Sequence, residues 1–360
     1  MKATISDIVR EHGREYLAKS GNYSAERRIL SDIERCRTAA LGGHRYQCTQ
    51  CGRQEIAYNS CRNRHCPQCL GSKTSKWLAA RVSELLPVKY YHCVFTLPAQ
   101  LRQIVLTNRV VLYDILFSAA AQTLKEVARN PKHLGADIGF FGILHTWTQT
   151  LEFHPHLHFV VPGGGLSNGQ WIEKKNKQFF LPVKVLSRVF RGKFIHELKH
   201  AHKNNKIKCL DIESLLNSSC HSDWVVYCKP PFAGPDAVLK YLSRYTHRIA
   251  MSNARIVSLK NAVVSFVARA KKQGSGQRVI KLQACEFIRR FLLHRIPRSF
   301  TRIRHFGLLA NKGRKQTLEL LKNLLKAPTL IPPPQKPWLK CACGCSIWLI
   351  IAPITPCNST

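Results

Sequence analysis

The sequence predicts an α+β fold built around a mainly antiparallel sheet. Strand-like and helical stretches alternate irregularly, and neighbouring strand-like stretches are joined by short turns. The stretch "GFFGILHTWTQTLEFHPHLHFVVPGGG" (139–165) is typical of two strands joined by a tight turn, and "ARIVSLKNAVVSFVAR" (254–269) is typical of a second hairpin. Because parallel strands need long crossover connections, these short turns favour antiparallel pairing over a doubly wound fold.

The other elements follow from the periodicity of the apolar residues and from the prolines and glycines. Helices are predicted over 1–40, 72–86, 99–130, 184–204, 235–250 and 270–326, and further strands over 88–97 and 223–231. Residues 44–69 are rich in Cys, His and turns, and 327–338 form a proline-rich linker. The predicted domains are an N-terminal zinc-binding region (1–86), a central domain (87–270), a basic helical region (271–327) and a linker with a Cys-rich tail (328–360).

The charge points to a polyanionic partner. The chain has 56 Lys and Arg against 20 Asp and Glu, a formal net charge of +36 over 360 residues. A small-molecule substrate does not need this excess, whereas nucleic acid does. The alternatives are a structural nucleic-acid binder or a merely soluble basic surface. We see no signal peptide and no apolar run of about 20 residues, so we expect a cytosolic protein without a membrane span.

Cysteine spacing predicts structural zinc. The pairs Cys48/Cys51 and Cys66/Cys69 are both CxxC, and two such turns can complete one tetrahedron. Free thiols or a redox pair are the alternatives; a reducing compartment argues against disulfides for the 15 cysteines. A possible second site, or simply core packing, comprises four further residues: Cys36, His44, Cys61 and His65. The tail cysteines Cys341, Cys343 and Cys345 have no evident fourth partner, which favours a degenerate zinc ribbon. The arginines beside the zinc cluster, Arg62 and Arg64, are expected to contact DNA.

The histidines of 153–165 predict a second kind of metal site. Period-two spacing puts His154, His156 and His158 on one face of a strand. Pro155 has no backbone donor and so is expected at the start of the strand, which leaves His156 and His158 as the regular pair. Two imidazoles at i and i+2 can share a divalent ion, with a third ligand from His145, Gln149 or His154. Surface histidines on an edge strand are the alternative.

The helix predicted at 235–250 carries two tyrosines on one face. Tyr241 and Tyr245 are four residues apart, and Arg244 and Arg248 add positive charge. Tyr245 also fits a core-facing stripe, so packing is the alternative. A tyrosine that attacks phosphate needs its phenolate favoured and the phosphate oxygens neutralised, which a histidine-bound metal and arginines could provide.

Four ordered motifs together resemble the rolling-circle insertion-sequence transposases with a two-tyrosine HUH nuclease. They are "SCRNRHCPQC" (60–69), "HPHLHFVVPGGG" (154–165), "YLSRYTHRIA" (241–250) and "EFIRRFLLHRIPRSFTRIRHFGLLA" (286–310). The resemblance covers almost the whole chain. It implies an HUH core, an antiparallel sheet with flanking helices, preceded by a small helical, treble-clef-like zinc domain. It also implies that His156 and His158 bind metal and that Tyr241 and Tyr245 are nucleophiles.

The sequence hypothesis is therefore a metal-dependent tyrosine endonuclease and strand transferase. It would nick and rejoin single-stranded DNA at element ends through 5′-phosphotyrosine links, using structural Zn²⁺ and catalytic Mg²⁺ or Mn²⁺. We expect cooperation with the host replication machinery and a place beside the nucleoid in the cytoplasm of a prokaryote. One rival is a carboxylate two-metal recombinase using such acids as Asp137, Glu152 and Glu173. Another is a catalytically inactive, zinc-dependent nucleic-acid-binding protein derived from such an element.

Overall fold

The computed structural model describes residues 3–21, 23–69, 77, 80–173, 180–221, 223–229, 238, 250–269, 276–328 and 339–357. The α-helices are α1 (Ile5–Lys19), α2 (Ser24–Arg35), α4 (Arg102–Thr107), α5 (Arg109–Arg129), α6 (Val183–Lys203), α7 (Ile212–Cys220), α9 (Ala284–Leu293) and α10 (Arg314–Leu324). The strands are β1 (Gly43–Cys48), β2 (Gln54–Tyr58), β3 (Tyr90–Thr96), β4 (Gly139–Trp147), β5 (Phe153–Pro162), β6 (Gly164–Ser167), β7 (Gln170–Glu173), β8 (Val226–Lys229), β9 (Ile256–Lys260), β10 (Val263–Arg269), β11 (Gln277–Gln283), β12 (Ile303–Gly307) and β13 (Trp348–Ile354). Short 3-10 helices are η1 (Ala39–Leu41), η2 (Ala99–Leu101) and η3 (Asn253–Arg255).

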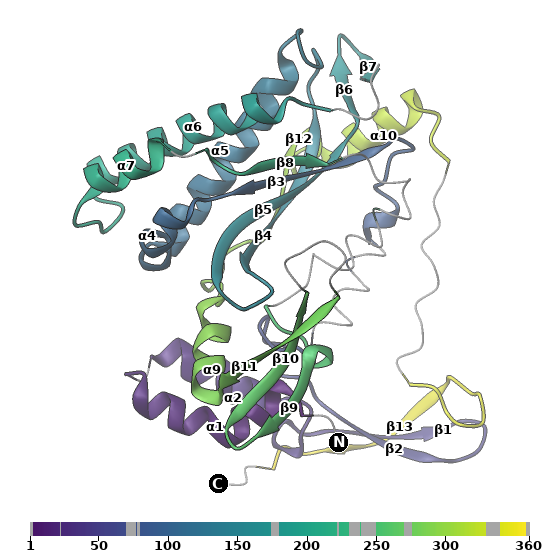
Figure 1. Ribbon diagram of the computed structural model, residues 1–360. Coiled ribbons are helices and arrows are strands. Elements are labelled where there is room, and N and C mark those ends of the chain that lie inside the picture. The colour runs from purple at the N-terminus through teal and green to yellow at the C-terminus, as the bar shows by residue number, and fades with distance from the viewer. Residues whose placement is uncertain are drawn as a thin grey trace.

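The central sheet has the order β12-β4-β5-β3-β8, and every neighbouring pair in it is antiparallel. The predicted α+β class is therefore confirmed. One face of this sheet packs on α5 and α6, which lie together on one side of it (Figure 1). Phe95, Phe159 and Phe190 meet edge to face in this layer and are fully buried. The apolar contact makes the sheet a rigid platform for whatever its opposite face carries.

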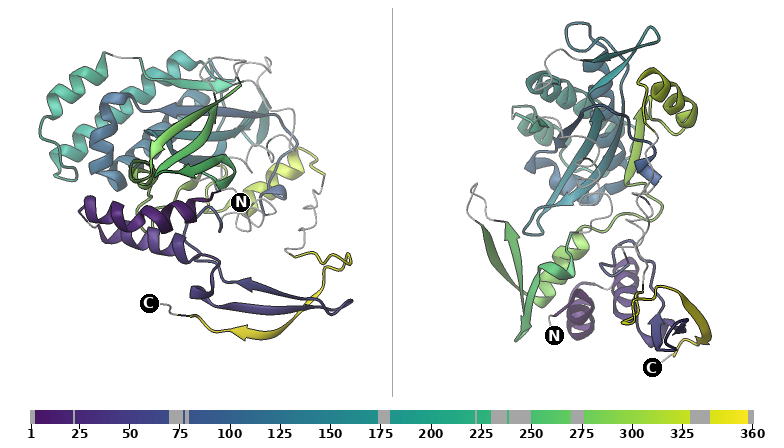
Figure 2. Two further views of the ribbon diagram at one scale, coloured as in Figure 1. Left: turned by 60° about the horizontal axis from the view of Figure 1, so that its bottom comes forward. Right: turned by 90° about the vertical axis from the view of Figure 1, so that its right-hand side faces the viewer.

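The opposite face of the central sheet is divided in two. Toward one end it is apolar, and Phe141, Ile143 and Val160 pack there with residues of α10. The yellow-green helix α10 lies on the side of the sheet opposite α5 and α6 (Figure 2). Val238, which is helical and fully buried, belongs to the same cluster. Toward the other end, the same face carries histidines of β4 and β5. Alternate residues of a strand point to opposite faces of the sheet, so these histidines lie on the face away from the phenylalanine core.

A second core joins distant parts of the chain. α1, α2 and α9 pack with the sheet β9-β10-β11, and Ile8, Phe266 and Phe287 are among the buried residues. Residues from 250–269 and 276–293 thus pack with the N-terminal helices, and β12 returns to the central sheet, so packing crosses the predicted boundaries at 86 and 270. The prediction that 270–326 is helical is wrong at β11 and β12. In β11, the β-branched pair Val279 and Ile280 and a full ladder with β10 favour a strand.

β6 and β7 form a two-stranded sheet, and a further three-stranded sheet pairs an N-terminal hairpin with the tail of the chain in the order β13-β1-β2. It lies away from the central sheet, with β13 alongside β1 (Figure 1). No helix among the described residues is long and apolar enough to cross a membrane.

Candidate metal centres

Three histidines meet on the face of the central sheet that lies opposite α5 and α6. His145 on β4 lies directly opposite His156 on β5, and His158 follows two residues later on the same face. Their ligand nitrogens all lie within 4.8 Å of one another. The pairing of two neighbouring strands fixes all three imidazoles, so the group needs no loop to hold it together.

Hydrogen bonds orient two of these imidazoles. The Nδ1 of His156 lies 2.7 Å from the backbone oxygen of His154. A carbonyl can only accept, so Nδ1 carries the hydrogen and the lone pair of His156 is on Nε2. The Nδ1 of His158 lies 2.8 Å from Nε2 of His92 on β3, and the two rings stack. Second partners of this kind fix the tautomer and orientation of metal-binding histidines.

Burial keeps the imidazoles of His156, His158 and His92 neutral at physiological pH. It lowers the pKa of His156 to about 4 and that of His92 to about 3, and it holds the pKa of His158 well below its ordinary value. The positive charge of Lys229 adds to the effect on His92 and His158. A neutral imidazole is the form that binds a metal, so no proton has to be removed first.

Of the three candidates for the third ligand, His145 is the one whose ligand nitrogen joins the pair. The ring of His154 instead lies beside Arg102, whose guanidinium is 3.1 Å from its Nδ1. Gln149 follows β4, and its backbone oxygen accepts a hydrogen bond from Arg255. Pro155 does not begin the strand as expected, because β5 starts at Phe153 and the register with β4 shifts beside it. This irregularity accommodates the missing backbone donor.

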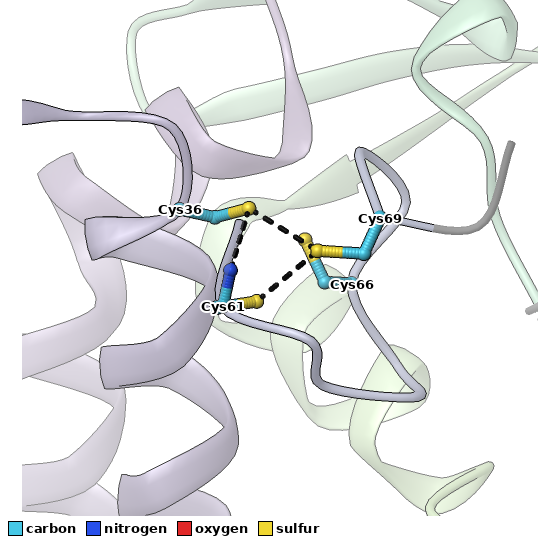
Figure 3. A group of neighbouring side chains, drawn as sticks. All are labelled: Cys36, Cys61, Cys66 and Cys69. Atoms are coloured by element: carbon cyan, nitrogen blue, oxygen red, sulfur yellow. Dashed lines mark hydrogen bonds between the residues drawn. The ribbon is translucent and has the colours of Figure 1, made fainter. Parts of the chain in front are cut away.

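One cysteine group is buried beneath the N-terminal helices. Cys36 follows α2, Cys61 follows β2, and Cys66 and Cys69 form a CxxC turn; all four sulfurs lie within 4.8 Å of one another (Figure 3). Sγ of Cys69 is 3.3 Å from Sγ of Cys36 and 3.4 Å from Sγ of Cys61. The thiol of Cys61 hydrogen-bonds to Cys36 and lowers the pKa of Cys36. Four sulfurs at these distances suit a tetrahedral zinc ion.

The expected grouping of Cys48, Cys51, Cys66 and Cys69 in one site is not the arrangement found. Cys48 and Cys51 lie at the turn of the β1–β2 hairpin, together with Cys341 and Cys343. Cys61 lies past the opposite end of β2, and a hairpin of this length separates its two ends by roughly 15–20 Å. The hairpin therefore keeps the two CxxC pairs apart.

His44 and His65, the histidines of the possible second site, belong to neither cysteine group. Nε2 of His65 accepts the backbone N–H of Ile296 at 2.9 Å, and its Nδ1 is bonded to the side chain of Asn63. Both nitrogens are thus engaged, and burial lowers the pKa of His65 to about 3. His65 therefore links the segment between Cys61 and Cys66 to the residues that follow α9.

The predicted DNA-contacting arginines Arg62 and Arg64 are both exposed. The guanidinium of Arg64 donates to the backbone oxygen of Phe300 at 3.0 Å. The predicted nucleophiles Tyr241 and Tyr245, and with them Arg244 and Arg248, lie outside the described residues.

Sequence reasoning missed two features. One is His92. The alternation of β3 places His92, Val94 and Thr96 on the sheet face that carries the histidines of β5. The partners of Cys341 and Cys343 are Cys48 and Cys51, which the spacing of the tail cysteines alone does not reveal. The sequence feature that indicates this pairing is the glycine after the second cysteine of each turn, Gly52 and Gly344.

Two family models match the chain. "Transposase zinc-binding domain" matches residues 8–97, and "Putative transposase" matches residues 139–317. The chain is 47% identical over 334 residues to "Putative transposase y4qJ" of Sinorhizobium fredii, covering 89% of this chain and 84% of that protein. It is 27% identical over 329 residues to "Transposase for insertion sequence element IS801" of Pseudomonas savastanoi pv. phaseolicola, covering 89% and 78%. No solved structure matches it. This chain belongs to the family of insertion-sequence transposases that carry an N-terminal zinc-binding domain.

Proposed function

We propose that this transposase cleaves and rejoins single-stranded DNA at element ends, with Tyr241 and Tyr245 as nucleophiles. The observation that carries the proposal is the group of His145, His156 and His158 on one rigid sheet face. Three protein ligands leave a coordination position for substrate, as is typical of catalytic rather than structural metal sites.

The chemistry of the donors fits a divalent ion. His156 is held with its lone pair on Nε2, and burial keeps the imidazoles of His156 and His158 neutral. Imidazole donors favour Mn²⁺ over Mg²⁺, while phosphate oxygens suit both. Bound there, either ion would withdraw negative charge from a scissile phosphate. His145 is the third ligand in this proposal, because its ligand nitrogen lies with those of the pair.

The tyrosines are included in the proposal because only a short stretch of chain separates them from Val238. Val238 belongs to the same buried apolar cluster as Ile143 and Val160, which share a sheet face with the histidines. Tyr241 comes three residues later, so its Cα lies within about 11 Å of the Cα of Val238. In the proposed step the tyrosine oxygen loses its proton and attacks phosphorus, the bond to the 3′-oxygen breaks, and that oxygen takes up a proton and leaves as a hydroxyl, so that no proton is gained or lost overall. The 5′-phosphate stays on the tyrosine, and the second tyrosine performs the next cleavage.

The surroundings support a DNA substrate. Lys229 lies opposite His92 on the same sheet face, and the chain as a whole carries a net charge of +36. Among the described residues, the carboxylates of the rival mechanism form no comparable group. In the part of the chain that the structure describes, neither Asp137, Glu152 nor Glu173 belongs to a group that could hold an ion. Such a reaction would take place beside the chromosome, in the cytoplasm of a prokaryote, and would rely on host replication.

The test is adduct formation on a single-stranded oligonucleotide that carries an element end and a 3′ label. With Mn²⁺, the labelled strand should migrate with the protein on a denaturing gel. Tyr241→Phe together with Tyr245→Phe should abolish the adduct. Tyr227→Phe is the matched control, because Tyr227 is an exposed tyrosine on the same sheet face. An adduct that survives the double substitution contradicts the proposal, and salt-sensitive binding without any adduct supports the inactive DNA-binding protein instead.

A further inference from the structure

The two ends of the chain carry matching turns. At the end of β1, the N–H of Cys48 donates to the oxygen of Arg53 (2.8 Å), and the N–H of Gly52 donates back to Cys48 (3.1 Å). In the tail, the N–H of Cys341 donates to the oxygen of Cys345, and the N–H of Gly344 donates back to Cys341, both at 2.9 Å. Both glycines have positive φ. The tail turn is thus the same cysteine turn with one residue fewer between its two cysteines.

The four sulfurs of these turns come together. Sγ of Cys51 lies 3.4 Å from Sγ of Cys341, and Sγ of Cys48 lies 3.7 Å from Sγ of Cys343. A tetrahedral ion with zinc–sulfur bonds of about 2.3 Å places its sulfurs about 3.8 Å apart, whereas a disulfide needs about 2.05 Å. Cys345 is not a member of this group, and its sulfur accepts the backbone N–H of Ile347.

The sheet attached to these turns needs another source of stability. β13 pairs with β1 from Gly43 to Cys48, but Leu349 and Ile350 of β13 are each about 60% exposed. None of the described residues of β1, β2 or β13 belongs to a hydrophobic core cluster. A three-stranded sheet without a core is marginal, and small domains of this kind often fold only with metal.

We propose that Cys48, Cys51, Cys341 and Cys343 hold a second structural zinc ion, separate from that of the buried group of Cys36, Cys61, Cys66 and Cys69. This ion joins the two ends of the chain and fixes β13 on β1. The matching family models end at residues 97 and 317, so Cys341 and Cys343 lie outside both. The proposal does not depend on the nuclease function. Under this proposal, the Cys-rich tail is part of the zinc-binding region, because it supplies two of the four zinc ligands.

The first experiment measures zinc per chain by mass spectrometry of the purified full-length protein under reducing conditions. We expect two zinc ions per wild-type chain and one in the Cys341→Ser/Cys343→Ser variant. Cys357→Ser is the matched control, because Cys357 is an exposed cysteine of the same tail outside both groups. The control should keep two ions. Two ions in the double variant, or one in the wild type, would overturn the proposal.

The second experiment uses only the wild-type protein, so it does not depend on the folding of a variant. The native protein is alkylated with iodoacetamide in reducing buffer, and the labelled cysteines are mapped by peptide mass spectrometry. Cys343 is exposed, yet a bound zinc ion should protect it until a chelator is added, whereas Cys357 should react at once. Equal labelling of Cys343 and Cys357 before chelation contradicts a metal at this site.

Discussion

The cysteine groups and the histidine group differ in donor number and in what holds them. Each cysteine group offers four sulfurs, while the histidine group offers three nitrogens. The cysteines lie on turns and join separate segments, whereas His145, His156 and His158 lie on two paired strands with a packed core behind them. A metal at the cysteines would hold the chain together, whereas a metal at the histidines would be held by a sheet that is already stable. Loss of metal should therefore unfold the first kind of site and only inactivate the second.

The largest expected effect is loss of the buried cysteine group. Cys66→Ser removes a fully buried ligand, and structural zinc contributes on the order of 10 kcal/mol to small zinc domains. We expect loss of helical signal and a clearly lower melting temperature by circular dichroism. Cys220→Ser, at a partly exposed cysteine outside both groups, is the control. An unchanged melting temperature for Cys66→Ser would remove the proposed structural role.

Loss of a histidine should lower activity and leave stability unchanged, in contrast to loss of a cysteine. His145→Ala should lower the rate of DNA cleavage about 10³-fold, because a bound ion is worth several kcal/mol of transition-state stabilisation. Zinc content and melting temperature should stay near those of the wild type. His196→Ala, on α6 and away from the group, is the control. Full activity in His145→Ala would point to another third ligand.

His92 provides a finer test, because it contacts His158 and is not itself in the ligand group. His92→Phe keeps a stacked ring but removes the hydrogen bond to His158. We expect Mn²⁺ affinity to fall about 10- to 100-fold, the usual cost of removing an orienting partner. Titration calorimetry measures this directly, and His92→Gln should recover part of the affinity if the hydrogen bond is the cause. Unchanged affinity in His92→Phe would show that stacking alone positions His158.

The smallest expected effect is that of pH. Burial lowers the pKa of His156 to about 4, so its ligand form is already complete at pH 6 and is lost only as pH falls toward 4. The pKa of His158 is shifted in the same direction. Between pH 8 and pH 6, protonation of His156 and His158 should together change Mn²⁺ affinity less than about twofold, while each histidine of ordinary pKa would cost about fourfold at pH 6. A tenfold decrease over this range would mean that the imidazoles titrate as exposed groups.

The elements governed by local patterns could be predicted from the sequence. The alternation of β3, β4 and β5, the hairpin β9–β10 and the long helices α5 and α6 all follow from apolar periodicity. The histidine pair also follows from alternation, since His156 and His158 on one strand must share a face.

Pairings between distant segments could not be predicted in this way. The union of Cys48 and Cys51 with Cys341 and Cys343 spans some 290 residues, and spacing within either turn does not reveal it. Similarly, α9 packs on α1, and β12 joins β4, because tertiary contacts decide which apolar faces meet. Choosing among His145, Gln149 and His154 required the register of β4 against β5, which the sequence does not specify.

The central claim is that the histidine group serves the cleavage reaction through an exchangeable divalent ion, while zinc stays at the cysteines. The most direct measurement is DNA–protein adduct formation after gentle dialysis against a weak chelator, with zinc counted in the same samples. The account predicts that the adduct disappears while zinc content stays constant, and that Mn²⁺ restores the adduct in the wild type but not in His145→Ala. Undiminished adduct formation after the divalent ion has been removed would contradict it.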